Sequence, residues 1–167
     1  MEKIRIYYVV LICGLLLSCK DSGEIPNEIV GQQVAEKIIS TAELKRSLEE
    51  KGFQTFDYID EKTKDTLLMQ QYFMAFLKSG PNRSKSKAEA DSLQALHLAH
   101  LGRMYKEGFA DISGPFGDNG EIRGITIYNV PTQKMADSLA NMDPLVKAGM
   151  LVIEIHPWWA AKGFMLR

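Results

Sequence analysis

Apolar positions along the chain follow two different periods, which predict a mixture of helices and strands. Segments with an apolar residue at every third or fourth position predict helices at 40–51, 84–107 and 131–141. Segments rich in aromatic and β-branched residues predict strands at 53–59, 67–77, 110–116, 122–130 and 151–156. From residue 67 onward the predicted order is strand, helix, strand, strand, helix, strand.

This order predicts an α+β protein with a ferredoxin-like βαββαβ antiparallel sheet that carries two helices on one face. The segment 53–59 is expected to form a hairpin with 67–77, so an N-terminal helix and hairpin strand precede the ferredoxin-like unit. Ser40 followed by Glu43 matches a capping box at the start of the first helix.

Alternation along the later strands predicts one apolar face and one mixed face. In the last strand Ile153 and Ile155 point one way and His156 the other, and we place Thr126 and Tyr128 on the same face as His156. A mixed face of this kind is either solvated or covered by the sheet of a second subunit. Alternation does not decide between these two arrangements.

The beginning of the chain has the features of a lipoprotein signal peptide. The apolar run at 6–17 is about a dozen residues long, which is shorter than the roughly 20 residues that a membrane-spanning helix needs. Leu16, Leu17 and Ser18 lead into Cys19, and this sequence resembles the lipobox of bacterial lipoproteins. We expect cleavage before Cys19 and lipidation of its thiol. The mature protein is then exported and anchored to a membrane of the bacterial cell envelope.

These expectations divide the chain into a signal peptide at 1–18, a lipidated cysteine and tether at 19–39, an N-terminal extension at 40–66 and a domain at 67–167. The only other cysteine, Cys13, lies in the cleaved segment, which excludes disulfides, thiolate catalysis and cysteine zinc sites from the mature protein. Cleavage takes one of the 21 acidic and two of the 20 basic residues and leaves a formal charge of −2, which indicates no nucleic-acid partner.

A histidine, a Gly-Pro pair and an Asp-Pro pair follow one another along the second half of the chain. They are His97 in the long helix, Gly114 with Pro115 after the next strand, and Asp143 with Pro144 before the last strand. In their order and spacing these residues resemble the YCII-related (YciI-like) domain over about 70–157. The resemblance implies a homodimeric α/β barrel, in which two ferredoxin-like sheets pack face to face, and a His-Asp pair as the active site. One relative in that family is a dehydrochlorinase of a chlorinated hydroxyquinol.

His97 also stands out from its position alone, because it shares an apolar helical stripe with Leu101 and Met104. A core-facing imidazole needs a polar partner, and Asp143 follows the second helix on the same side of the sheet. A carboxylate on one ring nitrogen fixes the tautomer and raises the basicity of the other nitrogen, as general acid/base catalysis requires. Alternatively, His97 is a satisfied core histidine and Asp143 only opens a turn.

The remaining site candidates are residues that we expect at the wall of a ligand pocket, namely Ser113, Gly114, Pro115, Tyr128, His156 and Trp158. His100 offers a second imidazole three residues after His97, but no acidic ligand accompanies the pair, and we predict neither a metal nor a cofactor. Two functions remain open. One is a small-molecule enzyme, of lyase or dehydrochlorinase type, that uses His97 and Asp143. The other is a non-catalytic dimeric ligand-binding or envelope module.

Overall fold

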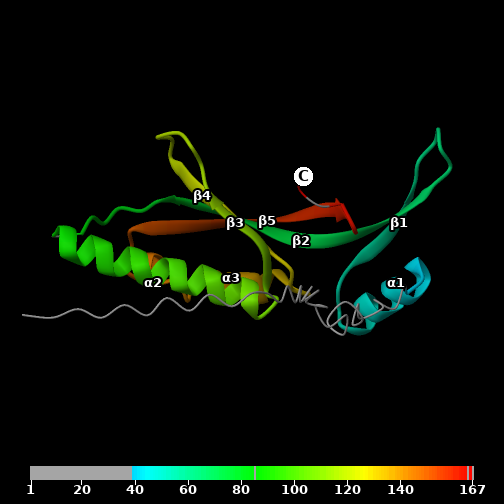
Figure 1. Cartoon of the computed structure of the whole chain (residues 1–167), viewed down its shortest axis with the longest axis horizontal. Helices are drawn as coiled ribbons and strands as arrows, with labels where there is room; N and C mark the ends of the chain where they lie inside the picture. Colours follow the sequence, from blue (N-terminus) through cyan, green and yellow to red (C-terminus); the bar gives the residue numbers. More distant parts are fainter. Residues whose placement is uncertain (1–38, 85, 165, 167) are drawn as a thin grey trace, which may run out of the picture. The chain divides into compact units, whose positions relative to one another are not determined.

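The computed structural model describes residues 39–84, 86–164 and 166. The predicted cleavage site, Cys19 and most of the tether lie outside these residues. The elements in chain order are α1 (Thr41–Glu50), β1 (Thr55–Ile59), β2 (Thr66–Ser79), α2 (Lys87–Lys106), β3 (Ala110–Pro115), β4 (Ile122–Tyr128), α3 (Gln133–Ala140), α4 (Pro144–Lys147) and β5 (Leu151–Ala161) (Figure 1). No helix among the described residues is long and apolar enough to cross a membrane.

The long strand β2 is the centre of one antiparallel sheet. It pairs with β5 from Met69 to Ser79, while β1 pairs with 66–70 and β4 pairs with 73–78. Because β5 occupies one edge of β2 along this length, β1 and β4 share the other edge end to end. β3 completes the sheet beside β4. The order β5-β2-β4-β3 is that of a ferredoxin-like sheet, which confirms the predicted α+β fold class.

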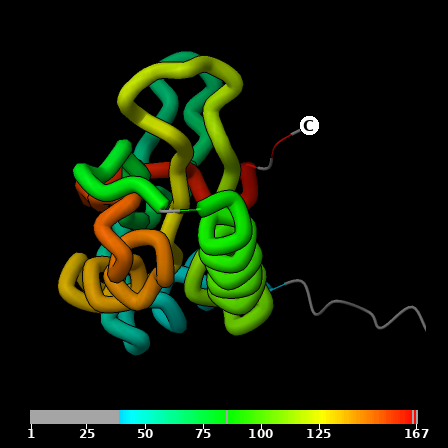
Figure 2. Tube along the Cα trace, turned by 90° about the vertical axis from the view of Figure 1, so that its left-hand side faces the viewer, coloured from blue at the N-terminus to red at the C-terminus, as the bar shows by residue number. Residues whose placement is uncertain are grey.

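Helices α2 and α3 lie on the same face of the sheet, opposite the side to which the β3–β4 hairpin rises (Figures 1 and 2). The core between these layers contains Phe73 of β2, Met104 of α2 and Ala136 of α3, all at most 4% exposed. The helices begin where capping side chains satisfy free backbone N–H groups. Ser40 and Glu43 form the predicted capping box, and Thr132 caps α3.

The predicted faces of β4 are wrong. Tyr128 lies opposite Phe73 and Thr126 lies opposite Ala75, so both side chains point toward the helices and are at most 2% exposed. The hydroxyl of Thr126 is hydrogen-bonded to that of Ser113 at 3.0 Å, which satisfies it inside the protein. The polarity of a residue is therefore a poor guide to the face of β4 on which it lies, because a hydrogen bond within the protein offsets the free-energy cost of burying the Thr126 hydroxyl.

The last strand continues five residues beyond the predicted end at His156, and Trp158 therefore belongs to the sheet rather than to a tail. Pro157 does not stop the strand, because β5 lies at an edge of the sheet, where one side of the strand needs no ladder hydrogen bonds. Trp158 pairs with Tyr72 of β2, their rings 6.1 Å apart, and Trp159 contacts Phe56 of β1.

Candidate active site on the helix side of the sheet

His97 lies in the middle of α2 and points toward the core, with only 8% of its surface exposed. Its Nδ1 is 2.6 Å from Oδ2 of Asp143, a hydrogen bond between residues 46 positions apart in the chain. The described residues offer no hydrogen-bond partner to the other ring nitrogen, Nε2. An imidazole held through Nδ1 in this way has its second nitrogen available for proton transfer.

Asp143 has two structural partners, one for each carboxylate oxygen. Oδ2 meets His97, and Oδ1 accepts a hydrogen bond of 2.8 Å from the backbone N–H of Leu145, which caps α4. The side chain is almost completely buried. The two alternative interpretations of Asp143 in the sequence, helix cap and histidine partner, are therefore compatible within one side chain.

The segment that carries Asp143 is held by the loop that follows β2. The N–H of Gly80 donates to the carbonyl of Met150 at 2.8 Å, and the Asn82 amide donates to the carbonyl of Ala148 at 2.9 Å. A Cβ atom on Gly80 would overlap the carbonyl group of Gly149, which itself has φ +70°. Close backbone approach at these two glycines thus fixes where the chain leaves α4.

His97 lines a hollow of about 330 Å³ between α2 and the sheet, which we call the helix-side hollow. Most of its wall is apolar, and the lining includes Leu77, Leu98, Leu101, Pro115, Gly124, Ile125, Leu145 and Leu151. An apolar wall strengthens electrostatic interactions at the imidazole and suits a small organic ligand. The volume is at the lower end of the range typical of ligand pockets.

Comparison with known proteins assigns the family. The model of the YCII-related domain matches residues 72–159, more than half of the chain. The chain belongs to the YCII-related domain family. No curated protein is significantly similar to it. A similar solved structure is 5-chloro-2-hydroxyhydroquinone dehydrochlorinase from Burkholderia phenoliruptrix AC1100 in complex with 2,5-dihydroxybenzoquinone. It is 21% identical, with 52% of this chain and 92% of that chain covered and a TM-score of 0.41.

The pocket residues predicted for this YCII-related domain do not all come together. Gly114 and Pro115 line the helix-side hollow with His97. Tyr128 is buried in the core, where desolvation raises the pKa of its hydroxyl and the nearby Asp143 carboxylate raises it further. Ser113 is hydrogen-bonded to Thr126 and does not line the helix-side hollow.

The other two predicted pocket residues, His156 and Trp158, lie on the face of the sheet that points away from the helices. Nε2 of His156 is 2.7 Å from a carboxylate oxygen of Glu154, and its ring meets the edge of Phe76. Trp158 lines a separate cavity on the same face. The sequence prediction therefore combined residues from opposite faces of the sheet, and Tyr128 was placed on the wrong face.

His100 is buried one turn after His97, and its Nδ1 lies 3.1 Å from the guanidinium of Arg103. Burial lowers the pKa of His100. No group of three or more His, Cys, Asp or Glu side chains in the described part of the chain is arranged to hold a metal ion. Sequence reasoning placed Leu101 beside His97 but did not identify Leu77, Leu98, Leu145 and Leu151 as lining of the hollow.

Proposed function

We propose that this YCII-related protein is a small-molecule enzyme in which His97, oriented by Asp143, transfers a proton in a lyase-type elimination. The observation that supports the proposal is the 2.6 Å hydrogen bond from Nδ1 to a buried carboxylate beside an apolar hollow. Asp143 selects the tautomer that leaves Nε2 unprotonated and able to act as a base. It also stabilises the imidazolium ion that forms when Nε2 takes a proton.

An elimination of hydrogen chloride illustrates the step. Nε2 of His97 accepts a proton from the substrate, the released electron pair forms a new double bond, and chloride leaves from the adjacent carbon. The imidazolium then gives the proton to water. Because the carboxylate of Asp143 already accepts two hydrogen bonds, it remains an acceptor throughout and does not need to take up the proton itself.

The test is release of chloride from a panel of chlorinated hydroquinols and hydroxyquinols, the class of compound named for the solved dehydrochlorinase. His97→Asn should reduce the rate by about 10²–10⁴ while the circular dichroism spectrum stays unchanged. His156→Asn, on the other face of the sheet, is the matched control and should keep the wild-type rate. Equal rates for His97→Asn and wild type contradict the proposal. Ligand binding without turnover across the panel favours the non-catalytic binding module.

We also propose that a second copy of the chain covers the part of the sheet around Phe76 and Val152 on the face that points away from the helices, so that the cavity at Trp158 on the same face stays open. What supports this is apolar surface on that face, where Met74 and Phe76 are half-buried and Val152 is 47% exposed in a single chain. Phe76→Glu should convert a dimer to a monomer in sedimentation experiments, whereas Lys134→Glu on α3 should not. A wild-type monomer at micromolar concentration contradicts a dimer.

For the beginning of the chain we propose lipidation at Cys19 and attachment to a membrane of the cell envelope. The support is the short apolar run and the lipobox-like residues before Cys19. Cys19→Ser should abolish labelling with a radioactive fatty acid and leave the precursor uncleaved. Cys13→Ser is the control and should change neither result. Labelling that persists without Cys19 contradicts the proposal.

A further inference from the structure

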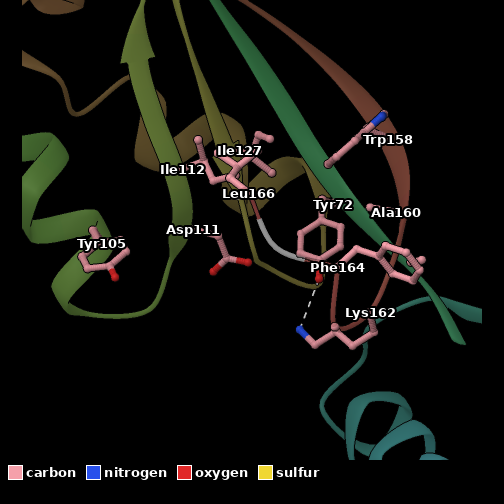
Figure 3. A pocket seen from close by; sticks show the side chains of 12 residues that line it. Tyr72, Tyr105, Asp111, Ile112, Ile127, Trp158, Ala160, Lys162, Phe164 and Leu166 are labelled. Carbon is pink, nitrogen blue, oxygen red and sulfur yellow. Dashed lines mark hydrogen bonds between the residues drawn. The ribbon is translucent and has the colours of Figure 1, made fainter.

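A second and larger cavity, of about 630 Å³, lies on the face of the sheet opposite the helices (Figure 3). Its floor includes Tyr72 and Ile127, whose neighbours Phe73 and Tyr128 point into the helix-covered core. The sheet therefore separates this open-face cavity from the helix-side hollow. None of the residues that line one also line the other.

One part of the open-face cavity is apolar. Ile112 of β3 and Ile127 of β4 lie side by side, and Trp158 of β5 lies across β2 from them (Figure 3). Tyr72 lies between these strands with its ring 6.1 Å from that of Trp158. This arrangement offers aliphatic and aromatic surface to a hydrocarbon side chain or ring.

The cavity also carries two opposite charges. Nζ of Lys162 donates a hydrogen bond of 3.2 Å to the hydroxyl of Tyr72, which orients the ammonium group. The carboxylate of Asp111 accepts from the Asn129 amide at 3.2 Å. Within the part of the chain that the structure describes, neither Lys162 nor Asp111 forms an ion pair. Both charges are therefore available to a ligand.

Asp111 is held from inside the protein. The Asn129 amide that binds it is in turn held by Nε2 of Gln70, at 2.7 Å, and Gln70 is completely buried. A buried glutamine that fixes an asparagine, which then fixes a carboxylate at a cavity wall, is a supported arrangement rather than a loose surface charge. Oε1 of Gln70 has no partner among the described residues, so the network is kept at some cost in stability.

We propose that the open-face cavity binds a free α-amino acid with an apolar side chain. The ligand carboxylate is recognised by Lys162 and the Tyr72 hydroxyl, its ammonium group by Asp111, and its side chain by Ile112 and Trp158. A zwitterion matches both charges, whereas a simple acid leaves Asp111 without a cation and a simple amine leaves Lys162 without an anion. The site lies apart from His97 and goes beyond the proposed reaction.

Three probes that share a phenylethyl group test this by calorimetry on the wild-type protein. They are L-phenylalanine, 3-phenylpropionate, which lacks the amine, and phenethylamine, which lacks the carboxylate. L-phenylalanine should bind at least tenfold more tightly than either of the others. Equal affinities for the three probes, tighter binding of 3-phenylpropionate, or no binding of L-phenylalanine overturns the proposal. This comparison needs no variant and so does not depend on how a substitution folds.

Substitutions then assign the two charges. Asp111→Asn should weaken the binding of L-phenylalanine at least tenfold and leave the affinity for 3-phenylpropionate within about threefold of wild type. Lys162→Gln should also weaken the binding of L-phenylalanine at least tenfold, and it should leave the affinity for phenethylamine within about threefold of wild type. Lys134→Gln on α3 is the matched control and should change nothing. His97→Asn should bind L-phenylalanine as wild type does, and a loss of binding in that variant overturns the assignment to a separate site.

Discussion

The two hollows on opposite faces of the sheet use a carboxylate in opposite ways. In the helix-side hollow, Asp143 is buried and both of its oxygens accept hydrogen bonds from the protein, so its charge acts on His97. In the open-face cavity, Asp111 is exposed and is held by a neutral amide, so its charge is directed to whatever enters. The first arrangement suits proton transfer, and the second suits recognition.

The surrounding elements explain this difference. Asp143 lies at a helix start, where the backbone N–H of Leu145 requires an acceptor, and a helix-borne imidazole faces it from α2. Asp111 lies in β3, a strand at the edge of the sheet, whose side chains on one face are open to solvent. The carboxylate at the buried helix terminus therefore has its hydrogen bonds inside the protein, and the carboxylate on the edge strand can still accept hydrogen bonds from a ligand.

Substitution of Asp143 should produce the largest effect and should be confined to one side of the sheet. Asp143→Asn keeps an oxygen to cap α4 but no longer holds His97 in the productive tautomer, so we expect a loss of activity of about 10²–10⁴. Asp143→Ala also removes the cap and leaves Nδ1 of His97 unpaired, which should lower the free energy of unfolding by about 2–4 kcal/mol. Chloride release and urea unfolding measure the two effects.

The matched measurement for Asp143→Asn is binding of L-phenylalanine, which should be unchanged because the open-face cavity contains no part of the Asp143 network. If this variant lost both chloride release and L-phenylalanine binding, the two hollows would not be independent, and the comparison between them would fail.

A substitution in the loop after β2, which holds the segment of Asp143, is expected to destabilise the protein more than a substitution in α2. Gly80→Ala places a methyl group against the carbonyl of Gly149, a backbone atom that cannot move aside cheaply. We expect a loss of about 2–4 kcal/mol in the free energy of unfolding. Gly102→Ala in α2 is the control. Apart from the helix's own backbone and the two adjacent residues, no atom of the described residues lies within 4 Å of the added Cβ there, and a gain of about 0.5–1 kcal/mol is expected in urea unfolding.

The order of elements in the ferredoxin-like unit was predictable because local signals agree with the final fold. The capping residue Thr132 marks the start of α3, and the strands carry the expected residue types. The predicted start of a helix was wrong where two serines close together could each cap it. The long helix starts after Ser86 rather than near Ser84, because the Ser86 side chain accepts the N–H of Glu89.

The faces of the strands and the second cavity were not predictable. Alternation shows which residues of β4 share a face, but only the register with β2 shows that Thr126 and Tyr128 face the helices. Lys162 lies beyond the predicted end of the last strand at His156, so the prediction did not place it beside the sheet. The proximity of His97 and Asp143 was anticipated because the apolar stripe of the helix and the family resemblance both indicated it.

The open-face cavity should be altered locally by removal of a single hydroxyl. Tyr72→Phe removes the oxygen that accepts from Lys162 at 3.2 Å and keeps the ring that packs on Trp158. We expect about 0.5–1.5 kcal/mol less stability and weaker L-phenylalanine binding, because Lys162 is less well oriented. Chloride release should be the same as in wild type. A loss of turnover in Tyr72→Phe would show that the sheet transmits changes from one face to the other.

The smallest effect we predict is a dependence of stability on pH that arises on the helix side. Burial lowers the pKa of His100. The charge of Asp143 opposes this shift, whereas the charges of Arg103 and His97 add to it. The unfolded chain, with a histidine pKa of about 6.5, therefore takes up a proton more readily than the folded protein does. Stability from this group is complete above about pH 6.5 and is lost as the pH falls below that value.

Urea unfolding at pH 7.5 and pH 5.5 measures this effect. His100→Gln should show a smaller drop in unfolding free energy between the two pH values than wild type, by about 1 kcal/mol or less. Arg103→Gln removes one of the charges that lower the pKa of His100. The decrease in its unfolding free energy between the two pH values should therefore lie between those of wild type and His100→Gln. A drop in His100→Gln equal to that of wild type would show that other groups cause the acid sensitivity. The burial of His100 would then have no measurable consequence for stability in this range, and the pH dependence would have to be sought elsewhere in the protein.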